Sequence, residues 1–179
     1  MAEIKRAKEA EKLWNQAADL RVGDKFEGRE PDYTKAIAEY SKLLELLPND
    51  DDSFTEGSRI LTKGDMYLER GLCYEELKQF EKALADYNKA ISLEPKKGKC
   101  YFSRSYIYIK NGEMEKAKAD VEKAVELDPK EAGRYYKSLA SCIRYNTEDK
   151  RTAAVYYKKS VEHGDYLGFS KKALDEWGM

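Results

Sequence analysis

Apolar residues recur every three or four positions along most of the chain, with charged residues between them. That spacing places apolar side chains on one face of a helix, so the pattern predicts amphipathic helices. The clearest examples are residues 67–95 and 101–129, each with two such stretches joined by a short polar turn. Pro95 and Pro129 follow the second stretch, where a ring that cannot continue a helix marks its end. The pattern therefore predicts an all-α protein built from antiparallel helix pairs.

The two segments are copies of each other. Positions separated by a step of 34 residues are Tyr74 and Tyr108, Ala83 and Ala117, Ala90 and Ala124, and Pro95 and Pro129. A period near 34 residues is typical of a solenoid of helix pairs. Because one pair cannot cover its own apolar face, successive pairs are expected to stack.

This pattern resembles the tetratricopeptide repeat (TPR), which places aromatic and small residues on the first helix of each pair and Ala, an aromatic, Ala and Pro on the second. The matching residues are Tyr67, Gly71, Tyr74, Ala83, Tyr87, Ala90 and Pro95 in one unit, and Tyr101, Ser105, Tyr108, Ala117, Val121, Ala124 and Pro129 in the next. The small residues would let the two helices of a pair approach closely. The resemblance implies a right-handed α-solenoid, the TPR superhelix, with the first helix of every pair on its concave side.

Weaker copies flank these repeats, so we expect a single TPR-like domain over residues 1–179. Its predicted parts are a divergent repeat with a long turn at 10–48, an insert at 49–63, repeats at 64–97 and 98–131, a divergent repeat at 132–164 and a capping helix at 165–179. The first copy would hold Trp14 and Ala18 on its first helix. From about Ser53 onward the insert is expected to extend the next helix, with Ser53 or Asp52 as its N-cap.

The last stretch places Phe169, Ala173 and Trp177 on one face at four-residue steps, bordered by Leu167 and Leu174. A terminal repeat needs a cover for its open end, and this stretch is expected to supply it. The alternative is that Trp177 docks into a partner or into a second copy of the chain.

Residues that could carry out catalysis are scarce. The single histidine, His163, precedes Gly164 at the end of a helix and is predicted to be a C-cap residue. The acidic run at 50–52 lacks the alternating ligands of a calcium loop, so a solvated turn is expected rather than a metal site. We therefore predict a protein that is not an enzyme and uses no cofactor or metal.

The cysteines are an odd, scattered set without metal-ligand spacing: Cys73, Cys100 and Cys142. Each falls in an apolar helical stretch, so they are expected to be small core residues. A reactive thiol is the alternative.

Charge and hydropathy limit the class of partner. The chain has 33 Lys and Arg against 34 Asp and Glu, a net charge of −1, whereas nucleic-acid binders usually carry a basic excess. No apolar run approaches the roughly 20 residues of a membrane span, and the first residues lack the apolar core of a signal peptide. We expect a cytoplasmic protein whose partners are proteins, not nucleic acids or membranes.

The resemblance also implies which residues would face the concave groove, where the family binds extended peptides or helices. These are Leu68, Glu69, Leu72, Glu76, Lys99, Phe102, Tyr106, Ile109, Lys110, Tyr136, Lys137, Ile143 and Arg144. The set is rich in apolar and aromatic anchors, and its charges separate, with acid in the first of the two clear repeats and base beyond it. The alternatives are that some of these residues are ordinary packing residues or are covered by the terminal helices.

One TPR subclass binds the acidic C-terminus of heat-shock chaperones through a set of Lys, Asn and Arg residues. The matching places here hold Asn15, Asp19, Glu69, Lys99 and Ser103, of which only Lys99 agrees. We therefore expect an adaptor that binds a peptide or helix of another partner protein. The alternative is a structural protein that self-assembles into a homo-oligomer through its terminal helix or groove.

Overall fold

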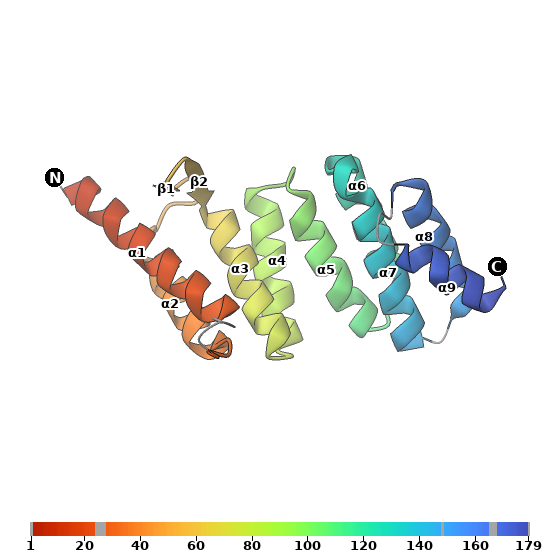
Figure 1. Cartoon of the computed structure of the whole chain (residues 1–179). Helices are drawn as coiled ribbons and strands as arrows, with labels where there is room; N and C mark the ends of the chain where they lie inside the picture. Colours follow the sequence, from red (N-terminus) through yellow and green to blue (C-terminus); the bar gives the residue numbers. More distant parts are fainter. Residues whose placement is uncertain (1, 24–27, 148, 165–167, 179) are drawn as a thin grey trace. The chain divides into compact units, whose positions relative to one another are not determined.

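The computed structural model describes residues 2–23, 28–147, 149–164 and 168–178 (Figure 1). The chain divides into two compact units, residues 1–95 (unit 1) and residues 96–179 (unit 2). Both are built from antiparallel helix pairs, so the predicted all-α fold of TPR type is confirmed.

Unit 1 contains two helix pairs and a small hairpin. Its elements are α1 (Ala2–Val22), α2 (Tyr33–Leu46), β1 (Ser53–Glu56), β2 (Arg59–Thr62), α3 (Lys63–Glu76) and α4 (Phe80–Leu93). Helix α1 packs on α2, α2 on α3, and α3 on α4. The predicted stacking of successive pairs is therefore present within this unit.

Trp14 anchors the long helix α1 to the rest of unit 1. Its ring meets Tyr40 of α2 edge-on at 5.6 Å and Phe54 of β1 at 6.3 Å between centroids. The small residues buried on the same helix are Ala10 and Ala17, whereas the predicted Ala18 is only half-buried. Aromatic pairs of this geometry add to the stability that burial alone provides.

The insert folds as an antiparallel hairpin, so the prediction that it extends α3 from Ser53 was wrong. Phe54 lies opposite Leu61, and both side chains are buried. Each strand buries one side chain between more exposed neighbours, as in a half-buried sheet. Gly57 adopts the positive φ of 58° that the turn requires. Helix α3 instead begins with Thr62 as N-cap, in a capping box with Asp65.

Unit 2 contains two further pairs and a final short helix. Its elements are α5 (Gly98–Lys110), α6 (Met114–Leu127), the 3₁₀ turn η1 (Pro129–Glu131), α7 (Ala132–Thr147), α8 (Lys150–Glu162) and α9 (Phe169–Trp177). Helix α7 packs on α5, α6 and α8, and α9 packs on α8. One continuous apolar core runs through these helices.

Several local predictions are confirmed. A Cβ atom on Gly71 would lie 2.6 Å from the ring of Tyr87, so only glycine allows α3 to approach α4 this closely. His163 is the C-cap of α8. Cys73 and Cys100 are buried, while Cys142 is half-buried.

Helix α9 covers the end of unit 2, as expected of a capping helix. Ala173 and Leu174 are buried, and Trp177 lies 5.8 Å from the ring of Tyr157 on α8. The predicted border residue Leu167 lies outside the described residues, and so does the side chain of Phe169. Trp177 therefore packs against the core of its own unit.

Candidate binding surface

In each complete repeat, one Arg–Asp ion pair joins the two helices, and the ion pairs of the two repeats are equivalent. Arg70 of α3 donates two hydrogen bonds of 2.8 Å to Asp86 of α4, and Arg104 of α5 donates two of 2.7 Å to Asp120 of α6. Two tyrosine rings flank each guanidinium: Tyr67 and Tyr74 around Arg70, Tyr101 and Tyr108 around Arg104. Bidentate geometry and ring contacts fix these side chains as framework. None of the four paired residues is one of the predicted groove positions.

In unit 1, the predicted groove residues of α3 are largely occupied by packing. Leu68 is 1% exposed and Glu69 is 8% exposed, whereas Leu72 is half-buried and Glu76 is exposed. Glu69 forms an ion pair with Arg21 of α1, at 3.0 Å between Oε2 and Nε. The carboxylate that we expected to face a ligand is therefore neutralised by the protein's own first helix.

The surroundings of this ion pair are also buried. Tyr40 of α2 and Cys73 of α3 are both 0% exposed, and burial raises the pKa of the Tyr40 hydroxyl. Burial likewise raises the pKa of the Cys73 thiol to about 12. A thiol with that pKa is protonated and unreactive at neutral pH, which argues against Cys73 as a nucleophile.

In unit 2, four predicted residues of α5 remain accessible. Lys99 and Lys110 are exposed, and Phe102 and Tyr106 are half-buried, whereas Ile109 is 4% exposed and belongs to the core. The four lie at steps of three and four residues, so they share one side of the helix. The ammonium of Lys110 lies 5.2 Å from the centre of the Tyr106 ring.

The predicted residues of α7 separate into two groups. Ile143 is fully buried, and Tyr136 is 4% exposed, with its hydroxyl donating a 2.7 Å hydrogen bond to Glu122 of α6. Tyr136 also stacks on Tyr156 of α8, so it points toward the second helices of the pairs. Lys137 and Arg144 are half-buried and keep accessible surface.

Sequence reasoning missed Arg134 at the start of α7. Its guanidinium lies 5.8 Å from the centre of the Phe102 ring on α5 and 5.1 Å from that of Tyr135. Phe102 and Tyr135 themselves stack at 4.5 Å. Arg134 therefore lies directly beside Phe102, one of the two accessible aromatic residues of α5. The 3₁₀ turn η1, which precedes α7, was not predicted from the sequence, so no pattern signalled this placement.

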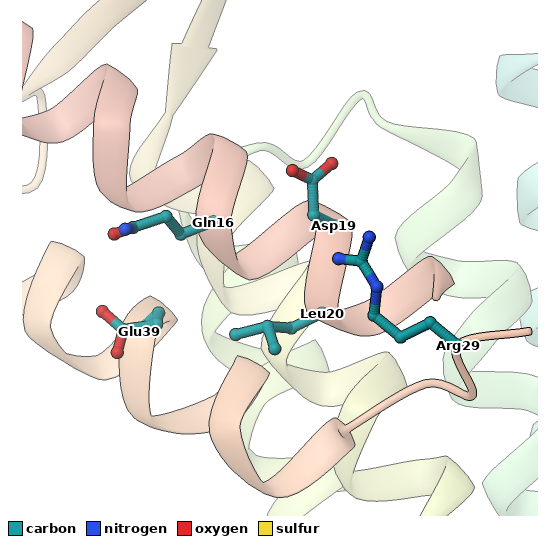
Figure 2. A pocket seen from close by; sticks show the side chains of 5 residues that line it. All are labelled: Gln16, Asp19, Leu20, Arg29 and Glu39. Atoms are coloured by element: carbon teal, nitrogen blue, oxygen red, sulfur yellow. The ribbon is translucent and has the colours of Figure 1, made fainter. Parts of the chain in front are cut away.

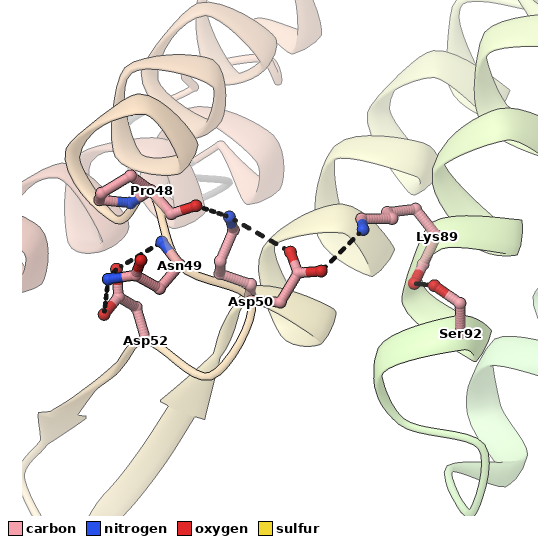
Figure 3. Close-up of polar contacts among 7 residues, drawn as sticks. Pro48, Asn49, Asp50, Asp52, Lys89 and Ser92 are labelled. Atoms are coloured by element: carbon pink, nitrogen blue, oxygen red, sulfur yellow. Dashed lines mark hydrogen bonds and ion pairs between the residues drawn. The ribbon is translucent and has the colours of Figure 1, made fainter.

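The acidic turn before the hairpin makes internal contacts (Figure 3). Asp50 forms ion pairs with Lys89 at 3.1 Å and with Lys63 at 3.7 Å, and the hydrogen bond from Lys89 is the main reason that the pKa of Asp50 is lowered. Asp52 accepts a 2.9 Å hydrogen bond from the backbone N–H of Asn49. Among the described residues, no group of three or more His, Cys, Asp or Glu side chains is placed to hold a metal ion.

A small polar pocket of about 280 Å³ lies between α1 and α2 (Figure 2). Its lining residues are Gln16, Asp19, Leu20, Arg29 and Glu39. Pockets that bind small molecules are mostly apolar and measure roughly 300–1,000 Å³. This pocket is smaller and four of its five lining residues are polar, so it does not favour a small-molecule ligand.

These features define a helical-repeat protein whose accessible charged and aromatic side chains lie on helix surfaces, not in a ligand pocket. Two family models described as tetratricopeptide repeats match residues 64–97, covering α3 and α4, and residues 98–131, covering α5 and α6. Residues 64–131 therefore form two tetratricopeptide repeats, as the sequence predicted, and such repeats form protein-interaction modules. No curated protein sequence matches it.

Solved structures share the fold. MamA from Desulfovibrio magneticus RS-1 is 24% identical, with a TM-score of 0.62 over 86% of this chain and 75% of that one. YrrB, described as a TPR protein with an unusual peptide-binding site, is 18% identical, with a TM-score of 0.59 over 82% of this chain and 66% of that one. An O-GlcNAc transferase mutant from Thermobaculum terrenum is 17% identical, with a TM-score of 0.65 over 88% of this chain and 26% of that one. At these identities the likeness shows the fold alone. Within the described ranges, no helix has the length and apolar character needed to cross a membrane.

Proposed function

We propose that the chain is a non-enzymatic adaptor that binds a peptide segment of a partner protein along α5 and α7 of unit 2. The observation that carries this proposal is the accessible pair Phe102 and Tyr106, which lies between exposed cationic side chains. Aromatic residues of this kind anchor many protein interfaces. The solved structure described as having a peptide-binding site supports the class of ligand.

The proposal assigns no role to the acidic positions of α3. Glu69 is paired with Arg21, and Leu68 is buried, so neither offers a free surface. Leu72 and Glu76 of α3 keep accessible surface, but they belong to unit 1 and are not included. Of the thirteen residues predicted from the family resemblance, the proposal retains Lys99, Phe102, Tyr106, Lys110, Lys137 and Arg144. Arg134 joins them because it lies beside Phe102.

The test compares proteins captured from a cell extract by the parent chain and by a Phe102→Ala, Tyr106→Ala variant. We expect the variant to lose the captured partners because both aromatic anchors are gone. The matched control is Val155→Ala with Val161→Ala, which removes two exposed apolar side chains from α8. Far-UV circular dichroism would establish that both variants remain folded. Capture that is unchanged in the Phe102 and Tyr106 variant would refute the proposal.

A further inference from the structure

The turn between α5 and α6 contains the only Asn-Gly pair of the sequence, Asn111 and Gly112. We propose that Asn111 is a site of spontaneous deamidation, a covalent modification that converts its side-chain amide to a carboxylate. In every other case the residue after the asparagine has a side chain; these asparagines are Asn15, Asn49, Asn88 and Asn146. The modification does not depend on the proposed function.

The reaction needs only atoms of the chain and water. The backbone nitrogen of Gly112 attacks Cγ of Asn111 and forms a C–N bond, which closes a five-membered imide ring. The proton of that nitrogen leaves with the side-chain NH₂ group, so one ammonia is released. One water then opens the ring. Cleavage of the new C–N bond gives aspartate, and cleavage of the original peptide C–N bond gives isoaspartate. Nothing is oxidised or reduced.

The turn leaves room for the imide ring. Asn111 and Gly112 are both exposed, and nothing lies within 4 Å of a Cβ atom built on Gly112. Gly112 adopts a φ of 77°, which glycine reaches without steric cost. Because Gly112 has no side chain, the attacking nitrogen is uncovered and the backbone on both sides of it can rotate.

Two hydrogen bonds hold the reacting groups apart in the folded chain. The Gly112 N–H donates to the carbonyl of Ile109 at 3.0 Å, and the Asn111 side-chain amide donates to Glu113 at 3.4 Å. Both lie at the exposed end of α5, where Asn111 is the C-cap. Hydrogen bonds at a helix end open at low free energy. Ring closure therefore requires only the last turn of α5 to open, while the core of unit 2 stays folded.

The equivalent turn between α3 and α4 shows that the fold does not require this chemistry. The backbone N–H of Lys78 donates to the carbonyl of Glu75 at 2.8 Å, as Gly112 does to the residue three before it. The place of Asn111 is taken by Leu77, which has no amide. The same hydrogen-bonded turn thus forms without an Asn-Gly pair, and the reactive pair is a property of one repeat.

The modification changes the end of α5. A carboxylate at position 111 lies at the negative end of the helix dipole. It also faces Glu113, which accepts a hydrogen bond from the unmodified amide, so two like charges replace that hydrogen bond. The isoaspartate form adds one methylene group to the backbone between α5 and α6. Modified chains should therefore unfold at a lower temperature than the parent.

The test is peptide mapping by mass spectrometry after the full chain has been stored in neutral buffer at physiological temperature. We expect the peptide that contains residue 111 to gain the mass that replaces NH₂ by OH, and to separate into aspartate and isoaspartate forms. Asn49 is the internal control, because it is exposed in a turn but precedes Asp50, and it should stay unmodified. Asn111→Leu, which copies Leu77, should lose the modification at this position and keep the far-UV circular dichroism of the parent.

Two results would overturn the assignment of the site. One is a parent chain in which residue 111 stays an asparagine while other asparagines are modified. The other is an equal rate of modification at Asn111 and Asn49. Asn111→Asp supplies the aspartate product directly, and we expect it to lower Tm. An unchanged or higher Tm would contradict the effect on α5.

Discussion

Helices α3 and α5 occupy equivalent places in consecutive repeats, yet their variable positions carry opposite charge. At the step of 34 residues, Asp65 aligns with Lys99 and Glu76 with Lys110. The framework does not change: Arg70 and Arg104 form the same bidentate pair with an Asp of the following helix. The comparison shows that one set of positions specifies the fold while another, on the same helices, sets the surface chemistry.

The two helices also differ in how their charges are used. On α3, Asp65 belongs to the capping box with Thr62 and pairs with Arg59, and Glu69 pairs with Arg21. On α5, Lys99 and Lys110 are exposed. The two paired acids of α3 therefore hold α1 and the hairpin in place, whereas the two aligned cations of α5 lie at exposed positions.

The largest expected effect comes from Trp14→Ala, which removes the anchor of α1. We expect unit 1 to lose about 3 kcal/mol of unfolding free energy, because a buried indole is replaced by a cavity beside Tyr40 and Phe54. The alkylation rate of a buried thiol reports on each unit. In the variant, Cys73 of unit 1 should be alkylated faster than in the parent chain, while the rate for Cys100 of unit 2 should not change. Val22→Ala, at an exposed site on α1, is the control. Equal acceleration of both thiols would contradict a separate effect on unit 1.

A smaller loss is expected from Glu69→Ala. The change strands the Arg21 guanidinium beside buried Tyr40 and should cost about 2 kcal/mol, less than for a fully buried pair because the Arg21 side chain is 31% exposed. Urea denaturation would measure the loss.

The equivalent position on α5 provides the matched variant. Ser103→Ala should cost less than about 1 kcal/mol, since a serine hydroxyl is uncharged and its removal strands no ionised partner. Adding Arg21→Ala to Glu69→Ala should restore part of the stability, because no stranded charge remains. Equal costs for Glu69→Ala and Ser103→Ala would show that the ion pair does not distinguish the two helices.

The smallest effect concerns the turns after α3 and α5. Lys78 adopts a φ of 57° where the next repeat has Gly112 at 77°. A side chain in this left-handed region costs roughly 1 kcal/mol, and nothing lies within 4 Å of a Cβ built on Gly112. Lys78→Gly should therefore stabilise the protein by up to about 1 kcal/mol, and Gly112→Lys should destabilise it by a similar amount. Thermal unfolding of both variants would check this prediction. Changes in Tm of the same sign for the two variants would contradict it.

Sequence periodicity was sufficient to predict the helix pairs, because the small and aromatic positions recur at a fixed step and must pack. It was not sufficient for the hairpin, since Phe54 and Leu61 pair across a turn and leave no helical period. The family resemblance also implied that Glu69 and Ile143 face a groove, but both side chains are buried. The burial of Glu69 depends on Arg21, far away in the chain, and that of Ile143 on the packing of α7 among its neighbours. The sequence pattern of a single helix does not predict such tertiary contacts.

The central claim is that ligand binding belongs to α5 and α7 of unit 2. Its most direct test is an amide NMR titration of the full chain with a peptide from a captured partner protein. We predict shift changes concentrated in residues 99–110 and 134–144, with residues 65–76 unaffected. Changes concentrated on α3 and α1, with α5 and α7 unaffected, would contradict the claim.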